Sequence, residues 1–264
     1  MKSFLKTENM VIDSHCHLNK IKQDLDTVLK NAKDNGVKYM LTICTELADV
    51  DEIKAITKKY NNVLCTFGIH PHEAENELLS VEQIMQFAKS MSAVAIGETG
   101  LDYFYDHSDR KQQKQSFKNH IIAASKLGLP LVVHTRDAED DTIAILDEMR
   151  KQYDFKTIFH CFSSDIRLAE YAVKNDIYLS ASGILTFKKS ENVRDSFRLV
   201  PKNLLLVETD APFLAPVPFR GKECEPVMTN NTLQTLADIH HTPVEDMARI
   251  TTENFRRLFK NCIK

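Results

Sequence analysis

Short apolar runs of strand length alternate eight times with polar, amphipathic stretches along this chain. The runs begin near Val11, Val37, Val63, Val94, Leu131, Thr157, Ile177 and Leu204. Strands that are apolar almost throughout, and not only at alternate positions, are typical of a parallel sheet covered by helices. Eight such units in 264 residues favour a closed (β/α)8 barrel of the TIM type over an open doubly wound sheet.

The stretches between the runs have the apolar periodicity of helices, for example over residues 21–35, 48–60, 81–91 and 110–127. One more helix is expected at the C-terminus, with Thr242 as its N-cap, Pro243 in its first turn and Glu245 completing a capping box. We therefore expect one domain over residues 1–264, with an extra C-terminal helix and with residues 1–9 as a flexible arm.

Composition and charge exclude some classes of protein. Lys and Arg number 34 against 37 Asp and Glu, so a net charge of -3 gives no general attraction to nucleic acid or to anionic membranes. The six cysteines contain no C-x-x-C pair and are expected to be reduced core thiols in a cytoplasmic protein. The apolar runs fall far short of the roughly 20 residues of a membrane helix, and no obligate protein partner is evident.

Five of the apolar runs end in side chains that commonly bind metal ions. These side chains are His15, His17, Glu98, His134, His160 and Asp210. Because the carboxyl ends of parallel strands converge on one face, the six are expected to meet there. Imidazole and carboxylate together suit Mg, Mn, Zn or Co, and six ligands are too many for one tetrahedral ion. The pattern predicts two divalent ions per chain.

Strand alternation also assigns roles to the neighbours of these ligands. Residues two apart in a strand face the same side, so Asp13 shares a face with the two histidines that follow it, and Glu208 shares a face with Asp210. Both acids are expected to orient ligands through hydrogen bonds, Asp13 through an imidazole N–H. Cys16 and Cys161 alternate away from the adjacent histidines, which argues against a catalytic thiol.

Several longer motifs surround the same positions. They are DSHCHL at Asp13, GIHPH at Gly68, GETGLDY at Gly97, VVHTRDA at Val132, FHCF at Phe159 and ETDAP at Glu208, with TTENFRRLF at Thr251 near the C-terminus. Together they make the chain resemble, essentially end to end, the TatD family of metal-dependent deoxyribonucleases in the amidohydrolase-like barrel group. The resemblance implies a TIM-type barrel, one or two divalent cations and hydrolysis of phosphodiester bonds, often in DNA.

The resemblance also implies roles for individual residues. It gives one ion to His15, His17, Glu98 and Asp210, with Glu98 as the bridging carboxylate, and the second ion to His134 and His160. It places His70, in GIHPH, near the scissile phosphate. One late segment departs from the family pattern, because FRGKECEP has Cys224 where an asparagine is usual, although Arg220 matches.

Other polar residues have two possible roles each. Arg136 follows His134 by two positions and either pairs with a phosphate oxygen or forms a structural pair with Asp137 or Asp102. Arg220 is a second candidate for phosphate binding. His72 is expected to be a loop residue, not a ligand. The remaining histidines, His107, His120, His240 and His241, are expected at the surface or at helix ends.

The function expected from these residues is hydrolysis by a metal-activated water, with Asp210 as the general base and a phosphodiester, most often DNA, as the substrate. Two alternatives stay open. The same site would serve an amidohydrolase-type enzyme that cleaves a C–N or ester bond, and a protein that binds metal without catalysis is also possible. A role for Arg136 or Arg220 in binding phosphate would distinguish a phosphodiesterase from the amidohydrolase-type enzyme. The full set of six ligands counts against a protein that only binds metal.

Overall fold

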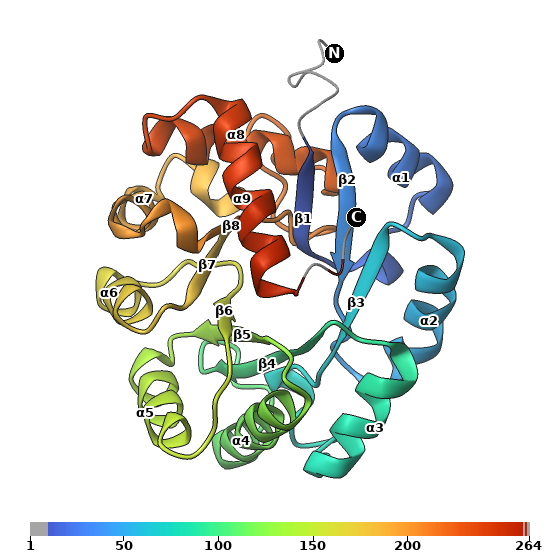
Figure 1. The fold of residues 1–264 in the computed structure, drawn as a ribbon, viewed down its shortest axis with the longest axis vertical. Coiled ribbons are helices and arrows are strands. Elements are labelled where there is room, and N and C mark those ends of the chain that lie inside the picture. Colours follow the sequence, from blue (N-terminus) through green and yellow to red (C-terminus); the bar gives the residue numbers. More distant parts are fainter. Residues whose placement is uncertain (1–9, 261, 263–264) are drawn as a thin grey trace.

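A computed structural model describes residues 10–260 and 262, so the predicted arm at residues 1–9 lies outside the described residues. Eight parallel strands are hydrogen-bonded in the order β1 to β8 and curl into a nearly closed barrel with helices around it (Figure 1). The predicted (β/α)8 architecture is confirmed.

The strands begin at the predicted residue or one residue after it. They are β1 Val11–Cys16, β2 Val37–Thr42, β3 Val63–Phe67, β4 Ala95–Asp102, β5 Leu131–Arg136, β6 Thr157–Phe159, β7 Tyr178–Ala181 and β8 Leu205–Val207. Their apolar side chains are almost all buried, between the barrel interior and the helix layer. Apolar runs of this kind fix strand positions well because both faces of the sheet are covered.

The helices of the described chain form the outer layer. They are α1 Leu25–Asp34, α2 Val50–Lys59, α3 Val81–Met91, α4 Arg110–Leu127, α5 Glu139–Arg150, α6 Ile166–Lys174, α7 Glu191–Leu199, α8 Thr229–Ile239 and α9 Val244–Leu258. The bounds of α3 and α4 are those predicted, since each begins at a strong cap. Ser80 and Gln83 form a capping box for α3, and the Asp109 carboxylate accepts two backbone N–H groups of α4.

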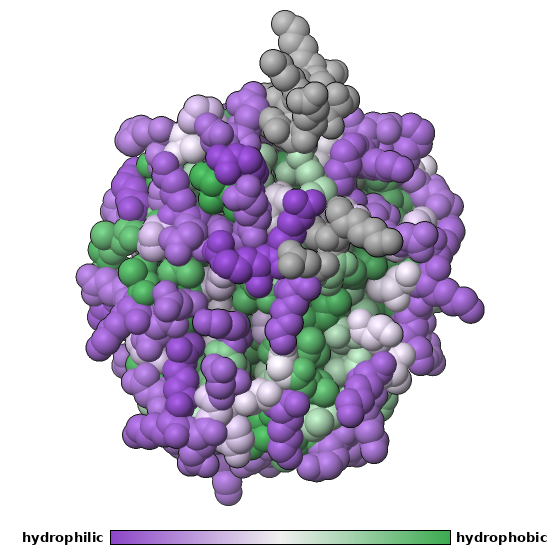
Figure 2. Space-filling view, viewed as in Figure 1, coloured by the Kyte–Doolittle hydropathy of each residue, from purple (hydrophilic) through white to green (hydrophobic). Residues whose placement is uncertain are grey.

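The extra C-terminal helix is present, but its predicted cap is wrong. Pro243 occupies the N-cap position, and the Thr242 hydroxyl instead donates to the carbonyl of His240. Among the described helices, none is both long and apolar enough to cross a membrane. On the face seen in Figure 2, hydrophilic side chains cover most of the outer helices, and hydrophobic ones show between them near the centre and at the left edge.

The barrel is drawn together between its first and last strands. The backbone N–H of Asp210 donates to the carbonyl of His15 at 2.9 Å, and that of His17 donates to the carbonyl of Ala211 at 2.7 Å. The Ser14 hydroxyl donates to the carbonyl of Val207 at 3.0 Å. These bonds place the segment that follows β8 directly beside the end of β1, where three of the predicted ligands lie.

Candidate metal centre

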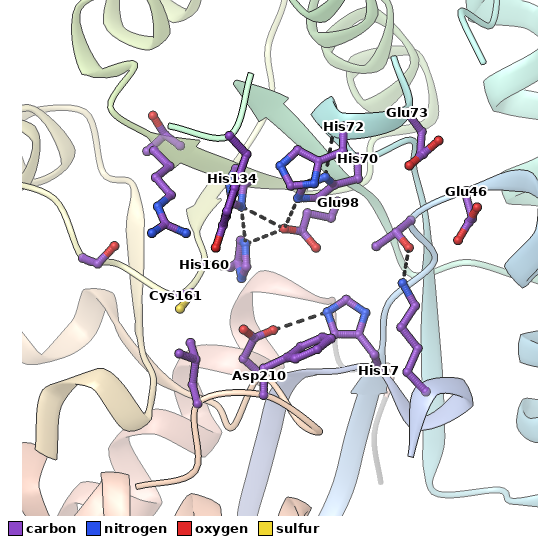
Figure 3. Close-up of a pocket in the computed structure, with 18 of the residues that line it drawn as sticks. His17, Glu46, His70, His72, Glu73, Glu98, His134, His160, Cys161 and Asp210 are labelled. Atoms are coloured by element: carbon purple, nitrogen blue, oxygen red, sulfur yellow. Dashed lines mark hydrogen bonds and ion pairs between the residues drawn. The ribbon is translucent and has the colours of Figure 1, made fainter. Parts of the chain in front are cut away.

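The six predicted ligands meet on the carboxyl-terminal side of the barrel, as Figure 3 shows for five of them, although Glu98 lies in the middle of β4 and not at its end as predicted. Their ligand atoms form overlapping groups in which every atom lies within 4.8 Å of the others. The groups are His15, Glu98 and His160; His15, His17 and Asp210; and His70, Glu98 and His134. The third group adds His70, which the sequence places near the substrate and not among the ligands.

Glu98 lies at the centre of the cluster and faces both halves of it. Its Oε1 is 2.6 Å from His160 Nε2, 3.1 Å from His134 Nδ1 and 3.5 Å from His70 Nε2. Its Oε2 is 3.4 Å from His15 Nε2. Burial raises the pKa of Glu98, but the facing histidines outweigh burial and hold the pKa well below its usual value. The carboxylate is therefore ionised, with one oxygen toward each set of imidazoles.

Asp210 closes the other side of the cluster. Its Oδ1 lies 3.3 Å from His17 Nε2 and 3.7 Å from His15 Nε2. The residue has a φ of 61°, in the left-handed region that Asp and Asn tolerate better than most residues. Burial raises the pKa of Asp210, but the hydrogen bond and the charge of His17 lower it by more. The net pKa of Asp210 is therefore below its usual value. An ionised oxygen thus faces the pocket at neutral pH.

Several histidine ring nitrogens of the cluster are buried and have no hydrogen-bond partner. Among the described residues, His15 Nδ1, His15 Nε2 and His17 Nδ1 have no hydrogen bond. Unpaired polar atoms are costly in a protein interior. The gaps of 3.4 and 3.7 Å around His15 Nε2 are longer than good hydrogen bonds, as expected of donor atoms arranged around a cation. The donor set therefore fits divalent ions.

Asp102 fixes the orientation of His134, and sequence reasoning missed it. Its Oδ2 lies 3.0 Å from His134 Nε2 and 3.0 Å from His72 Nε2. A carboxylate accepts, so Nε2–H of His134 is the donor, and in a neutral ring the lone pair of Nδ1 then faces Glu98 Oε1. Two acceptor atoms at 3.1 Å need a proton or a metal ion between them. The hydrogen bond from Nε2 is the outer contact usual for metal-binding histidines.

His72 lies where expected but has a role that the sequence did not predict. It lies on the short 3-10 helix η3 (Pro71–Glu73), as a loop residue should, but it lines the pocket and is bound by Asp102. No feature of the linear sequence joins it to Asp102, because the two come from neighbouring strand ends. The GIHPH and GLDY motifs that contain them are the only signal that was available.

Glu208 and Asp13 both lie behind the cluster, fully buried. Glu208 Oε1 accepts the backbone N–H of Cys161 at 2.7 Å and lies 3.5 Å from His160 Nδ1, a position from which it can orient that ring. Asp13 accepts from the backbone and hydroxyl of Thr209 and from the backbone N–H of His15. It therefore ties β1 to the end of β8, and the expected bond to an imidazole N–H is absent among its contacts. Burial raises the pKa of Asp13 to about 8.

Two expectations about burial and alternation are corrected. Cys161 lines the pocket, because β6 ends at Phe159 and Cys161 has a φ of 43°, so strand alternation no longer applies there. Burial raises the pKa of its thiol well above normal, which leaves it protonated. His120 is completely buried in α4, where Nε2 accepts the backbone N–H of Ile69 at 3.1 Å and Nδ1–H donates to the carbonyl of Ser116.

A pocket of about 650 Å³ opens above the cluster. His70 and Arg136 both line it, whereas Arg220 is not among its lining residues. The Arg136 guanidinium lies over the rings of Phe104 and Tyr105, at 3.9 and 4.8 Å, and makes neither of the structural pairs weighed from the sequence. Arg220 is exposed and stacks on Phe187. Its predicted contact with substrate therefore has no support from this arrangement.

Comparisons with known proteins agree with the motifs. The family described as TatD related DNase matches residues 12–260. The chain is 41% identical over 254 residues to the uncharacterized metal-dependent hydrolase YcfH of Escherichia coli, covering 94% of this chain and 95% of that protein. It is 35% identical to the uncharacterized metal-dependent hydrolase YabD of Bacillus subtilis, over 95% and 99% of the two chains. The crystal structure of YjjV, a TatD homolog from Escherichia coli, superposes with a TM-score of 0.87 at 26% identity, over 95% and 98% of the chains.

Proposed function

Because this chain belongs to the TatD-related DNase family of metal-dependent hydrolases, we propose that it is a deoxyribonuclease that cleaves phosphodiester bonds in DNA. The observation that carries the proposal is the buried cluster of four histidines and two carboxylates at the floor of an open pocket. The catalytic chemistry would be divalent-metal-dependent hydrolysis. The alternative is cleavage of a C–N or carboxylic ester bond, which would use the same cluster. The two functions differ in the substrate, because only a nuclease needs pocket walls that bind phosphate.

Two divalent ions per chain fit the donor atoms. His15, His17, Asp210 and Oε2 of Glu98 would hold one ion, and His134, His160 and Oε1 of Glu98 would hold the other. When bound, such ions lower the pKa of a water molecule and neutralise charge on a phosphate, whether they are Mg, Mn, Zn or Co. Glu208 and Asp102 would keep the His160 and His134 rings in place.

Asp210 is the general base of the proposal. Its carboxylate is ionised and lines the pocket, so it can accept the proton of the attacking water. The side-chain partners of Asp210 are two imidazoles, and among the described residues no lysine or arginine holds it in an ion pair. A proton taken up there can later leave through the pocket.

Arg136 and His70 are the residues proposed to bind the phosphate. Burial lowers the pKa of His70 well below normal, so the ring is neutral. Its Nδ1 accepts the backbone N–H of His72, which leaves Nε2–H as a donor on the side of Glu98. Among the described residues, the guanidinium of Arg136 contacts only aromatic rings. Its N–H groups are therefore available to bind an anion. Such local donors are needed because the net charge of -3 attracts no polyanion.

We place the enzyme in the cytoplasm, where its DNA substrate lies. The six cysteines support this, since all are free and four of them are buried. Free buried thiols are usual in reducing compartments.

One comparison tests the function. The purified protein, with Mn²⁺ or Mg²⁺ added, is assayed on single-stranded DNA, duplex DNA, RNA, bis(4-nitrophenyl) phosphate, a dipeptide and 4-nitrophenyl acetate. We expect metal-dependent cleavage of DNA and of the small phosphodiester, and none in EDTA. Cleavage confined to the dipeptide or the acetate ester would make the protein an amidohydrolase-type enzyme. Metal binding without turnover of any substrate would make it a binding protein.

A further inference from the structure

Lys20 is a cation in the pocket wall that neither the motifs nor the metal centre explain. It ends the 3-10 helix η1 (Leu18–Lys20), three residues after His17, and its side chain lines the pocket. Its Nζ donates to the hydroxyl oxygen of Thr45 at 2.9 Å. Within residues 10–260, no carboxylate forms an ion pair with it. An unneutralised ammonium at a partly buried position has unused capacity to bind an anion.

A buried network holds this ammonium in place. The hydroxyl and the backbone N–H of Thr45 both donate to Oδ2 of Asp49, at 2.7 and 2.9 Å. The side chain of Asn19 donates to Oδ1 of the same carboxylate at 2.7 Å. Because the Thr45 proton is committed to Asp49, only a lone pair of its oxygen faces Lys20. Two of the three N–H groups of Lys20 therefore stay available.

Lys20 and Arg136 flank the metal centre from opposite sides. Lys20 follows β1 and Arg136 ends β5, and these strands lie four places apart in an eight-stranded barrel. Arg136 also has no carboxylate partner in the described chain. Two free cations on either side of one hydrolytic centre match a substrate that carries more than one negative charge along its length.

We propose that Lys20 binds a second phosphate of the substrate, next to the phosphate that is cleaved. The inference rests on the proposed function and narrows it, because the site then takes an oligonucleotide in preference to an isolated phosphodiester. Glu46 and Glu73 line the same pocket, and Figure 3 shows them toward its edge, away from the histidine cluster. Their charge disfavours further phosphates along that wall, so Lys20 binds one phosphate and not a longer track.

Substrates that differ by one phosphate test this subsite. The first is a thymidine dinucleotide with one phosphodiester and no terminal phosphate, and the others carry an added phosphate at the 5′ or the 3′ end. For the unchanged enzyme, one of the added phosphates should lower KM about tenfold, the usual worth of a charge-assisted hydrogen bond. Lys20→Met should abolish that gain with kcat little changed, and Lys20→Arg should keep part of it.

Two further variants separate phosphate binding from general effects. Lys22→Met removes an exposed ammonium two residues away that does not line the pocket, and it should leave every KM unchanged. Thr45→Val removes the acceptor that holds Lys20 and should lose part of the gain. An equal rise in KM for substrates with and without the terminal phosphate, or no rise in Lys20→Met, would overturn the subsite.

A binding measurement distinguishes this inference from the proposed function. Phosphorothioate analogues of the same dinucleotides are titrated into the Mn²⁺-loaded protein and followed by calorimetry, and the unmodified dinucleotides are incubated with the same protein to measure cleavage. Affinity that depends on both the terminal phosphate and Lys20, with no cleavage of the unmodified dinucleotides by the Mn²⁺-loaded protein, would keep the subsite and remove the nuclease. Cleavage of the dinucleotides with no dependence on Lys20 would keep the nuclease and remove the subsite.

Discussion

Asp210 combines two properties that make it the sharpest single-residue test of the site. It stands in the left-handed region at a φ of 61°, and its carboxylate faces both His15 and His17. Most substitutions there would strain the backbone, but Asn is well tolerated in that conformation. Asp210→Asn therefore changes the chemistry of one oxygen without disturbing the turn that follows β8.

We predict that Asp210→Asn lowers kcat by about 10²–10⁴-fold, the usual cost of losing a general base. Initial rates with a small phosphodiester, at saturating metal, measure the effect. Asp176→Asn is the matched control, because Asp176 has a φ of 52° and is exposed just before β7. An Asp210→Asn enzyme that keeps its metals and a near-normal kcat would remove Asp210 as the base.

At the scale of the element, strand β4 carries Glu98 into the centre of the cluster because a glycine lets it approach β5. Gly100 has a φ of 139°, and a Cβ there would lie 2.0 Å from the carbonyl oxygen of His134. Only glycine fits so close an approach at that φ. The positions of Glu98 and His134 thus depend on a residue without a side chain.

Gly100→Ala should destabilise the fold by about 2–5 kcal/mol, from backbone strain together with overlap against β5. Gly221→Ala is the control, since Gly221 also has a positive φ but a Cβ there would meet nothing within 4 Å. Urea unfolding of the two variants gives the comparison. Equal stability of the two variants would show that β4 does not need the close approach.

Helix α4 contributes a buried titratable group. Burial lowers the pKa of His120 from 6.5 to about 4, because a charged ring would lose its hydration, and the bond to the Ser116 carbonyl offsets only part of that. The neutral ring also accepts the backbone N–H of Ile69. The unfolded chain then binds more protons than the folded one between these two pH values. The stability that a neutral His120 allows is fully present above pH 6.5 and is lost as the pH falls toward 4.

His120→Gln should therefore flatten the pH dependence of stability. Between pH 7.5 and pH 4.5 the unchanged protein should lose about 2–3 kcal/mol more than the variant does. Unfolding free energies from urea titrations at the two pH values provide the test. A variant that loses as much stability as the unchanged protein would show that His120 titrates normally.

Prediction from sequence succeeded where local pattern decides structure. Apolar runs located all eight strands, because burial on both faces fixes the position of a parallel strand. They also led to Glu98 and His134, although β4 and β5 do not end at these residues as predicted but continue to Asp102 and Arg136. Prediction from sequence failed where a residue's contacts come from a distant segment of the chain. The pairing of Asp102 with His72 and the burial of His120 depend on contacts that span 30 and 51 residues. The position of Cys161 in the pocket was not predicted, because strand β6 ends two residues before it and strand alternation no longer applies there.

At the scale of the whole molecule, five segments of the barrel contribute to one cluster, so metal binding there would be coupled to folding. Glu98 raises the pKa of His160 well above normal and, with Asp102, raises that of His134, even though burial lowers both. In the metal-free protein these rings therefore keep their protons to higher pH than ordinary histidines do. Bound metal ions must displace those protons.

We predict that metal binding releases protons and raises the melting temperature. Metal at 100 times its Kd should stabilise the fold by about 2.7 kcal/mol, and EDTA should remove that gain. Calorimetric titration with Mn²⁺ in buffers of different ionisation enthalpy counts the protons, and affinity should rise with pH. Binding without proton release would contradict the protonated state of the two histidines.

The central proposal is that one cluster on the carboxyl-terminal side of the barrel would hold two divalent ions, with Glu98 as a ligand of both. An anomalous difference map from crystals soaked in Mn²⁺ tests it most directly. We predict two peaks about 3.5–4 Å apart, one against His15, His17 and Asp210 and the other against His134 and His160. A map with no peak at these residues, or with its peaks at other sites on the chain, would contradict the account.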